Sequence, residues 1–152
     1  MGVLVRVKEI MIREIMEHQI EIIYSGELRT WSTHLKSGDD IITDAPVDNQ
    51  GKGEAFSPTD LLASALGSCM LTIMGITANT QNINIDGTYA TVKKVMGEEP
   101  RRIAEIHLDI TFIQPVSEKH RTVLERAAHH CPVSKSLHPD LKEVVTFNYP
   151  EE

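Results

Sequence analysis

The segment SPTDLLASALGSCMLTIMGITA occupies residues Ser57–Ala78 and carries the clearest structural signal in this sequence. Ser57 is a favourable N-cap, Pro58 suits the first helical position, and Asp60 places a carboxylate near the positive end of the helix. No charged residue follows Asp60 until after Gln81, while apolar residues recur at helical spacing. Because an uncharged helix has no solvent face, the sequence predicts a helix buried within the protein or between subunits.

The same helix is long enough to cross a membrane, which takes about 20 predominantly apolar residues. Three features oppose a membrane span. Asp60, Gly67 and several hydroxyl groups lower the hydropathy, no basic cluster flanks the segment, and no second segment of this kind exists in the sequence. We expect instead that Ala63 and Gly67 let another helix approach closely. A helix buried on all sides needs more cover than one small sheet offers, so the sequence also predicts a dimer.

Short strands and further helices are predicted around this helix, which gives an α+β fold with a single domain over residues 18–152. In chain order we expect a strand meander over 18–43, a loop over 45–56, a hairpin of 87–96 and 103–113, a helix over 117–130 and a closing strand over 141–149. Residues 1–17 form an extension whose pattern fits either a strand or an amphipathic helix.

The composition excludes several classes of protein. The chain has 152 residues, with 15 Lys and Arg against 22 Asp and Glu and a formal net charge of −7. An acidic chain lacks the basic surface that attracts phosphate backbones or anionic lipids, so we expect neither nucleic acid nor a membrane as a partner. Charged residues interrupt every apolar run near the N-terminus, which argues against a signal peptide and favours a cytoplasmic protein.

Two cysteines, Cys69 and Cys131, are the chemically distinctive residues of the chain. Two thiols are too few for a secreted disulfide scaffold, and they form no CxxC pair of the kind that binds zinc. Cys69 lies in the apolar stripe of the long helix, where a cysteine is often simply a small core residue. Cys131 precedes Pro132 at the predicted start of a short helix. Backbone N–H groups and the helix dipole favour a thiolate there, so Cys131 is a plausible redox thiol.

His129 and His130 directly precede Cys131 and raise the question of a metal site. Consecutive residues on a helix point about 100° apart, so these two imidazoles cannot easily join Cys131 around one ion. No HxxxH pattern supplies further ligands. The sequence therefore predicts no metal and no other cofactor.

Together these features resemble the OsmC/Ohr superfamily of thiol-dependent organic hydroperoxide reductases. The resemblance rests on SPTDLLASALGSCM, on HCPVSKSL around Cys131 and on the long gap between the two thiols, and it covers about residues 19–149. The hairpin sequence EEPRR at residues 98–102 looks like the branch that includes the YhfA-like proteins. The resemblance implies an OsmC-like fold and an intertwined homodimer, in which antiparallel sheets wrap around two central helices and the active sites lie at the interface.

The resemblance also implies a reaction. In the peroxidase branches, the first cysteine attacks the peroxide O–O bond and becomes a sulfenic acid, and the second condenses with it to a disulfide. An external dithiol, such as a lipoylated protein, then restores both thiols. Carried over to this chain, Cys69 is the peroxidatic residue and Cys131 the resolving one. The implied function is reduction of small organic hydroperoxides in oxidative-stress defence.

One position departs from the family pattern. Peroxidase members use an Arg to activate the thiolate and a Glu, directly after the cap proline, to hold that Arg, but Thr59 occupies the position here. Asp60 is adjacent but points elsewhere on a helix. Arg29 is the candidate for the Arg and Glu54 for the carboxylate, although each also fits a solvated surface residue. Two alternatives therefore stay open: a non-peroxidase OsmC-like protein that binds a small ligand at the dimer interface, and a structural dimer with inert cysteines.

Overall fold

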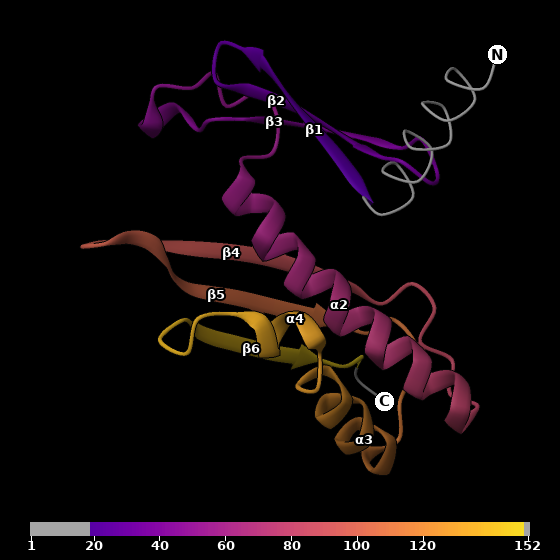
Figure 1. Cartoon of the computed structure of the whole chain (residues 1–152). Coiled ribbons are helices and arrows are strands. Elements are labelled where there is room, and N and C mark those ends of the chain that lie inside the picture. The colour runs from indigo at the N-terminus through magenta and orange to yellow at the C-terminus, as the bar shows by residue number, and fades with distance from the viewer. Residues whose placement is uncertain (1–18, 151–152) are drawn as a thin grey trace, which may run out of the picture. The chain divides into compact units, whose positions relative to one another are not determined.

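The structure is a computed structural model that describes residues 19–150, so the predicted extension over residues 1–17 lies outside the described residues (Figure 1). The chain divides into two compact units, Met1–Pro58 and Thr59–Glu152. The first unit holds a three-stranded sheet, and the second holds another three-stranded sheet together with the α-helices. The mixture of sheets and helices confirms the predicted α+β class.

The first unit is an antiparallel meander with the strand order β1-β2-β3, as the sequence predicts. Its strands are β1 (Ile20–Gly26), β2 (Arg29–His34) and β3 (Asp40–Asp44). After β3 the chain passes through a short 3-10 helix, η1 (Val47–Asn49), and returns to the end of β3. There the Asp44 N–H donates to the Phe56 carbonyl at 3.0 Å. This return brings the end of the loop over residues 50–56 beside the end of β3.

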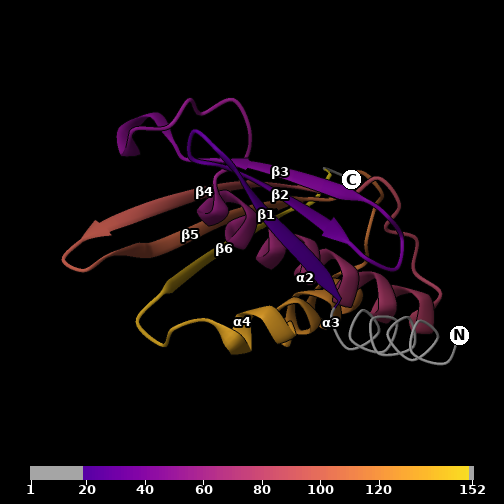
Figure 2. The same cartoon turned by 45° about the horizontal axis from the view of Figure 1, so that its top comes forward.

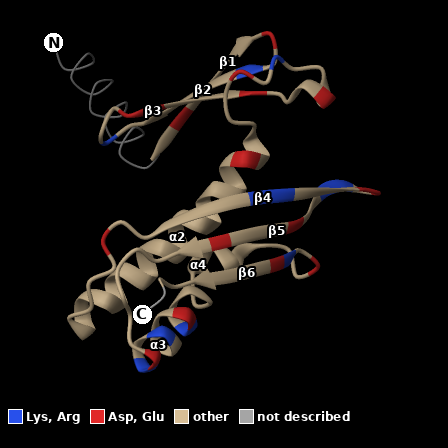
Figure 3. Ribbon diagram, turned by 180° about the vertical axis from the view of Figure 1, so that it is seen from behind, with Lys and Arg blue, Asp and Glu red and all other residues tan. Residues whose placement is uncertain are grey.

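The helix α2 (Pro58–Gln81) begins at the predicted proline and continues past the predicted end at Ala78. Apart from its first turn the ribbon carries no charged residue, as Figure 3 shows. Its buried residues share one face of the helix: Ala63, Leu66, Gly67, Met70, Met74 and Ala78. A Cβ added at Gly67 would lie 3.1 Å from Leu108 Cδ2 and 3.3 Å from Val92 Cγ2. Within the second unit, then, Gly67 permits close approach to strands, whereas the sequence predicted approach to a helix.

By length and hydropathy α2 could cross a membrane, with a mean hydropathy of 1.8 over its most apolar 18 residues. This is weak evidence, because a helix in the core of a soluble protein passes the same test. Of that window, 33% is buried within the described structure, so α2 has one packed face rather than cover on all sides.

The sheet of the second unit has the strand order β4-β5-β6. The strands β4 (Tyr89–Glu98) and β5 (Arg101–Thr111) form the predicted hairpin, and β6 (Lys142–Asn148) is the predicted closing strand. However, β6 pairs with β5 in parallel, so the expected antiparallel arrangement does not hold for this pair. The reason lies in the connection, because helices between two strands return the chain to the end at which it started.

That connection contains α3 (Glu118–Ala128) and the short α4 (Pro132–Ser136). Figures 1 and 2 show α2, α3 and α4 on the same face of the sheet. The core lies between this helical layer and the alternate residues of β5 that point toward it, namely Ile106, Leu108 and Ile110, all fully buried. The helical layer is what brings the two distant cysteines together.

Candidate active site

The two thiols meet in the second unit, where α2 passes the start of α4. Cys69 lies on α2 and is partly exposed, whereas Cys131 is completely buried directly before Pro132. Cys69 packs against the apolar cluster that contains Cys131, and it contributes to the raised pKa of Cys131. Both residues are free thiols. The fold thus brings an accessible thiol and a shielded one to the same cluster, although the two are far apart in the sequence.

Burial decides the protonation of the second thiol. It raises the pKa of Cys131 above its ordinary value, and the hydrogen bond with Cys69 raises it further. The backbone N–H groups of Ser134 and Val133 act in the opposite direction, although neither forms a complete capping hydrogen bond with the side chain. The sequence argument that a helix start favours the Cys131 thiolate is therefore wrong in its net direction, because the loss of hydration outweighs the helix start.

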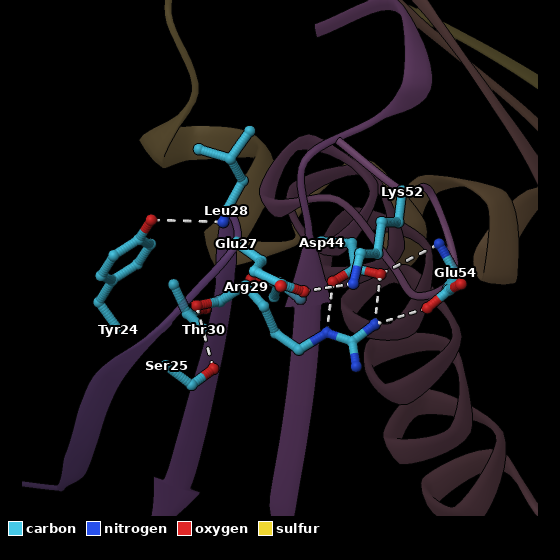
Figure 4. A network of polar contacts seen from close by, with 10 residues as sticks. Tyr24, Ser25, Glu27, Leu28, Arg29, Thr30, Asp44, Lys52 and Glu54 are labelled. Carbon is cyan, nitrogen blue, oxygen red and sulfur yellow. Dashed lines mark hydrogen bonds and ion pairs between the residues drawn. The ribbon is translucent and has the colours of Figure 1, made fainter. Parts of the chain in front are cut away.

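A second polar site lies in the first unit and is centred on Arg29 (Figure 4). Arg29 and Asp44 are paired across β2 and β3. The Arg29 Nε donates to Asp44 Oδ1 at 2.6 Å, and Nη2 donates to Asp44 Oδ2 at 2.8 Å. Nη2 also donates to Glu54 Oε2 at 3.1 Å. Two parallel hydrogen bonds fix the plane of the guanidinium as well as its position.

Arg29 and Asp44 each favour the charged form of the other, because each shifts the pKa of its partner. The hydrogen bond with Asp44 raises the pKa of Arg29 above its already high value, and Glu54 adds to this. Hydrogen bonding to Arg29 lowers the pKa of Asp44, and the Glu54 backbone N–H, 3.1 Å from Asp44 Oδ2, lowers it further against the effect of burial. The side chain of Asp44 is only 2% exposed, whereas that of Arg29 is 35% exposed. The buried carboxylate of Asp44 therefore fixes one edge of the Arg29 guanidinium, while part of the Arg29 side chain stays exposed to solvent.

The contacts of Arg29 leave one of its nitrogens available. Within residues 19–150, every hydrogen bond of the Arg29 side chain comes from Nε or Nη2. Figure 4 shows none at the third nitrogen, Nη1. A guanidinium has five N–H donors, so the Nη1 edge can still receive an anion. Such a group can stabilise a thiolate or a developing alkoxide.

The residues at the start of α2 have partners of a different kind. The Lys94 Nζ on β4 donates to Thr59 Oγ1 at 2.8 Å and forms an ion pair with Asp60. Thr59 occupies the position where the family pattern has Glu, and here it accepts a hydrogen bond from Lys94. Asp60 forms an ion pair with the same lysine. These contacts link the first turn of α2 to β4 within the second unit.

The structure brings Arg29 and Glu54 together, as the sequence suggested, and adds Asp44, which the sequence analysis missed. The sequence alone did not pair Asp44 with Arg29. A turn over residues 36–40 would place residue 47 opposite Arg29, whereas the observed register places Asp44 there. Opposite charges at paired positions of neighbouring strands attract each other, so the pair follows from the register and not from the strand positions.

Comparison with known proteins identifies the family to which this fold corresponds. A family model described as OsmC-like protein matches residues 51–144. A search of the curated proteins found no match.

Among solved structures, a protein from Psychrobacter arcticus 273-4 is 53% identical, with a TM-score of 0.84 over 86% of this chain and 96% of that one. Its provisional description is an osmotic stress induced and detoxification response protein. An organic hydroperoxide resistance protein from Legionella pneumophila is 16% identical, with a TM-score of 0.67 over 85% of this chain and 94% of that one. One from Bacillus subtilis is 20% identical, with a TM-score of 0.60 over 85% and 96%. The last two likenesses show the fold alone. With the family match and the 53% identity over most of the chain, this protein belongs to the OsmC-like protein family.

Proposed function

We propose that this protein is a thiol-dependent peroxidase that reduces organic hydroperoxides. The observation that carries the proposal is that a partly exposed Cys69 packs against the apolar cluster containing the buried Cys131 and influences its pKa. In this proposal a peroxide reaches the first thiol from solvent, and the second thiol condenses with the product. The presence of organic hydroperoxide resistance proteins among the structures of the same fold agrees with this reaction.

The proposed reaction has three balanced steps. The Cys69 thiolate attacks the O–O bond of ROOH, which with one proton gives Cys69–SOH and the alcohol ROH. The Cys131 thiol then displaces the hydroxyl group, so that a Cys69–Cys131 disulfide forms and water leaves. An external dithiol finally reduces this disulfide and is itself converted to a disulfide.

The raised pKa of Cys131 fits the second role rather than the first. A buried, protonated thiol is a poor nucleophile toward peroxide, so Cys131 stays intact while Cys69 is oxidised. Once the sulfenic acid has formed next to it, proximity compensates for low nucleophilicity, because the reaction is now intramolecular. The division of roles implied by the family resemblance thus has a physical basis in burial.

We also assign to Arg29 the role of activating cation. A guanidinium held by two hydrogen bonds to Asp44 and one to Glu54 has a fixed plane and a remaining donor edge at Nη1. In this proposal, Asp44 and Glu54 together replace the glutamate that is absent at Thr59. The departure at position 59 then does not remove the carboxylate support that such an arginine needs.

The assembly is proposed to be a homodimer, as is general in the OsmC/Ohr family. Its support comes from each unit by itself: Ile22 and Tyr24 are exposed on one face of the meander, and Ile76 is exposed on α2. Exposed apolar side chains that gather on one face usually mark interaction surfaces in soluble proteins. Two free thiols agree with a reducing compartment such as the cytoplasm. Sedimentation at micromolar concentration tests the assembly, and a monomeric mass would contradict it.

Stopped-flow oxidation by cumene hydroperoxide, followed by turnover with a dithiol, tests the proposed activity. We expect Cys69→Ser to abolish turnover, and Cys131→Ser to permit one round of oxidation that stops at the sulfenic acid. A dimedone adduct on Cys69 in the second variant identifies that intermediate. The proposal fails if wild-type protein shows no turnover that depends on Cys69, or forms no Cys69–Cys131 disulfide.

A further inference from the structure

The short helix α4 sets the position of the second thiol. Cys131 directly precedes α4, and the Lys135 N–H donates to the Cys131 carbonyl at 3.2 Å, which ties the first turn to that residue. A helix of five residues has almost no stability of its own, because helix nucleation is costly. Its position, and with it the position of the Cys131 thiol, must be fixed by contacts with the rest of the unit.

Two kinds of contact hold α4. Val133 and, just beyond the helix, Leu137 pack against the apolar core. In addition, Ser134 Oγ donates to Glu143 Oε2 on β6 at 3.1 Å in a partly buried setting. Glu143 is paired with Ile106 in the parallel ladder, on the face of the sheet that carries the helices. Within residues 19–150, this is the one hydrogen bond that joins a side chain of α4 to another element.

Apolar contacts alone tolerate small displacements, whereas disulfide formation does not. The bond requires Cβ atoms roughly 3.5–4.5 Å apart and a narrow range of torsion, so a small shift of α4 moves Cys131 out of reach of Cys69. A hydrogen bond to a carboxylate is directional and stronger than a neutral one, and it therefore fixes the rotation of the first turn.

We propose that Ser134 and Glu143 are positioning residues for the resolving thiol, whose hydrogen bond holds α4 on β6 so that Cys131 closes the disulfide with Cys69. The reaction that they assist is Cys69–SOH plus Cys131–SH giving Cys69–S–S–Cys131 and water. The inference rests on the proposed pairing of the thiols, but it concerns closure of the disulfide and not attack on the peroxide.

Equilibration with glutathione tests the inference without any peroxide. The protein dithiol reacts with oxidised glutathione to give the protein disulfide and two molecules of reduced glutathione, and the equilibrium constant measures the effective concentration of one thiol at the other. We expect Ser134→Ala to lower this constant by about 3- to 10-fold, the range that the loss of one hydrogen bond gives. Glu143→Leu should act in the same way, and the double variant should lose no more than either alone.

Two variants serve as controls. Ser136→Ala removes a hydroxyl from the same helix, one that donates to the Pro132 carbonyl within α4 at 2.9 Å, and it should behave as wild type. Glu143→Gln keeps an acceptor oxygen for Ser134 and should largely retain the wild-type constant. Thermal unfolding of all variants separates displacement of α4 from general loss of stability, because only the former changes the constant at an unchanged Tm.

A kinetic readout adds a second criterion. With cumene hydroperoxide, the rate of Cys69 sulfenic acid formation should be unchanged in Ser134→Ala, while the closure step slows and overoxidation to the sulfinic acid increases.

Equal glutathione constants for Ser134→Ala, Ser136→Ala and wild type would overturn the inference, as would the absence of any Cys69–Cys131 disulfide. If Ser134→Ala lowers the constant in a protein without hydroperoxide turnover, the positioning role stands and the proposed peroxidase activity fails. If the protein turns over hydroperoxide but Ser134→Ala leaves the glutathione constant unchanged, the peroxidase activity stands and the positioning role fails.

Discussion

Arg29 and Asp44 face each other across β2 and β3, and their side chains form a two-point ion pair with N–O distances of 2.6 and 2.8 Å. The carboxylate is buried and the guanidinium is partly exposed, so the strand pairing itself orients the cation toward solvent. Glu54 adds a third contact from the loop that follows. If Arg29 activates the thiolate as proposed, Asp44 is its main support.

Replacing Asp44 should therefore impair activity more than replacing Glu54. We expect Asp44→Asn to lower kcat/KM for cumene hydroperoxide by about 10- to 100-fold, because a small misplacement of a catalytic group has effects of that size. Glu54→Gln should have a smaller effect, since its side chain is 64% exposed and the amide still offers an acceptor. Glu27→Gln, which breaks the neighbouring exposed ion pair with Lys52, is the control and should leave kcat/KM unchanged. Similar values for Asp44→Asn and Glu27→Gln would contradict the assigned role.

Charge alone should not replace the geometry of the guanidinium. A lysine at position 29 keeps the positive charge but cannot form the two-point contact with Asp44, so we expect Arg29→Lys to lose most of the activity that Arg29→Ala loses. Steady-state turnover of both variants with the same dithiol provides the comparison. Full activity in Arg29→Lys would mean that only net charge matters at this position.

The ion pair should also make stability depend on pH in acid. The pKa of Asp44 is lowered from its ordinary value of 3.8, so the unfolded state binds the proton more tightly than the folded state does. The stabilisation from the pair is complete above an unfolded-state pKa of about 4 and is lost as the pH falls through the lower folded-state pKa. Urea unfolding of wild type and Asp44→Asn should therefore show a difference in stability that is constant above about pH 5 and narrows toward pH 2. A difference that widens in acid would show that the sign is wrong.

Two glycines of α2 provide a matched test of how the helix packs. A Cβ at Gly67 would meet Leu108 at 3.1 Å and Val92 at 3.3 Å, whereas one at Gly75 meets nothing within 4 Å. We expect Gly75→Ala to stabilise the protein by up to about 1 kcal/mol through helix propensity. Gly67→Ala should be less stable than Gly75→Ala by about 1 kcal/mol or more, because overpacking offsets that gain. Thermal denaturation of the two variants measures the difference, and equal Tm values would show that the sheet adjusts without cost.

The extent to which sequence predicts this structure depends on the range of the interactions involved. The start of α2 at Pro58 and the hairpin of β4 and β5 follow from local signals: a cap, a proline, an uncharged run and alternation of apolar residues. The parallel placement of β6 does not, because alternation locates a strand without giving its direction. The approach of Gly67 to strands rather than to a helix was equally invisible, since a small residue shows only that something comes close.

For the site, the residue types were readable and their environments were not. The shared cluster of Cys69 and Cys131 depends on how α2 and α4 pack over the sheet, and the sequence suggested the pairing only through the family resemblance. The direction of the Cys131 pKa depends on burial, which a local helix start does not report. Asp44 escaped notice because a single acidic residue at the end of a strand reads as part of a turn, and its meaning lies in the register with Arg29.

The position of Cys131 in the connection between β5 and β6 has a consequence for the covalent structure of the oxidised protein. Cys131 lies in the crossover between those strands and Cys69 lies before the hairpin, so a disulfide between them encloses β4, β5 and α3 in one covalent ring. A ring of that size restricts the unfolded chain strongly, and in the chain-entropy description it stabilises the fold by roughly 4 kcal/mol. In the proposed reaction cycle, the second unit would then alternate between a less stable dithiol form and a more stable ring-closed form.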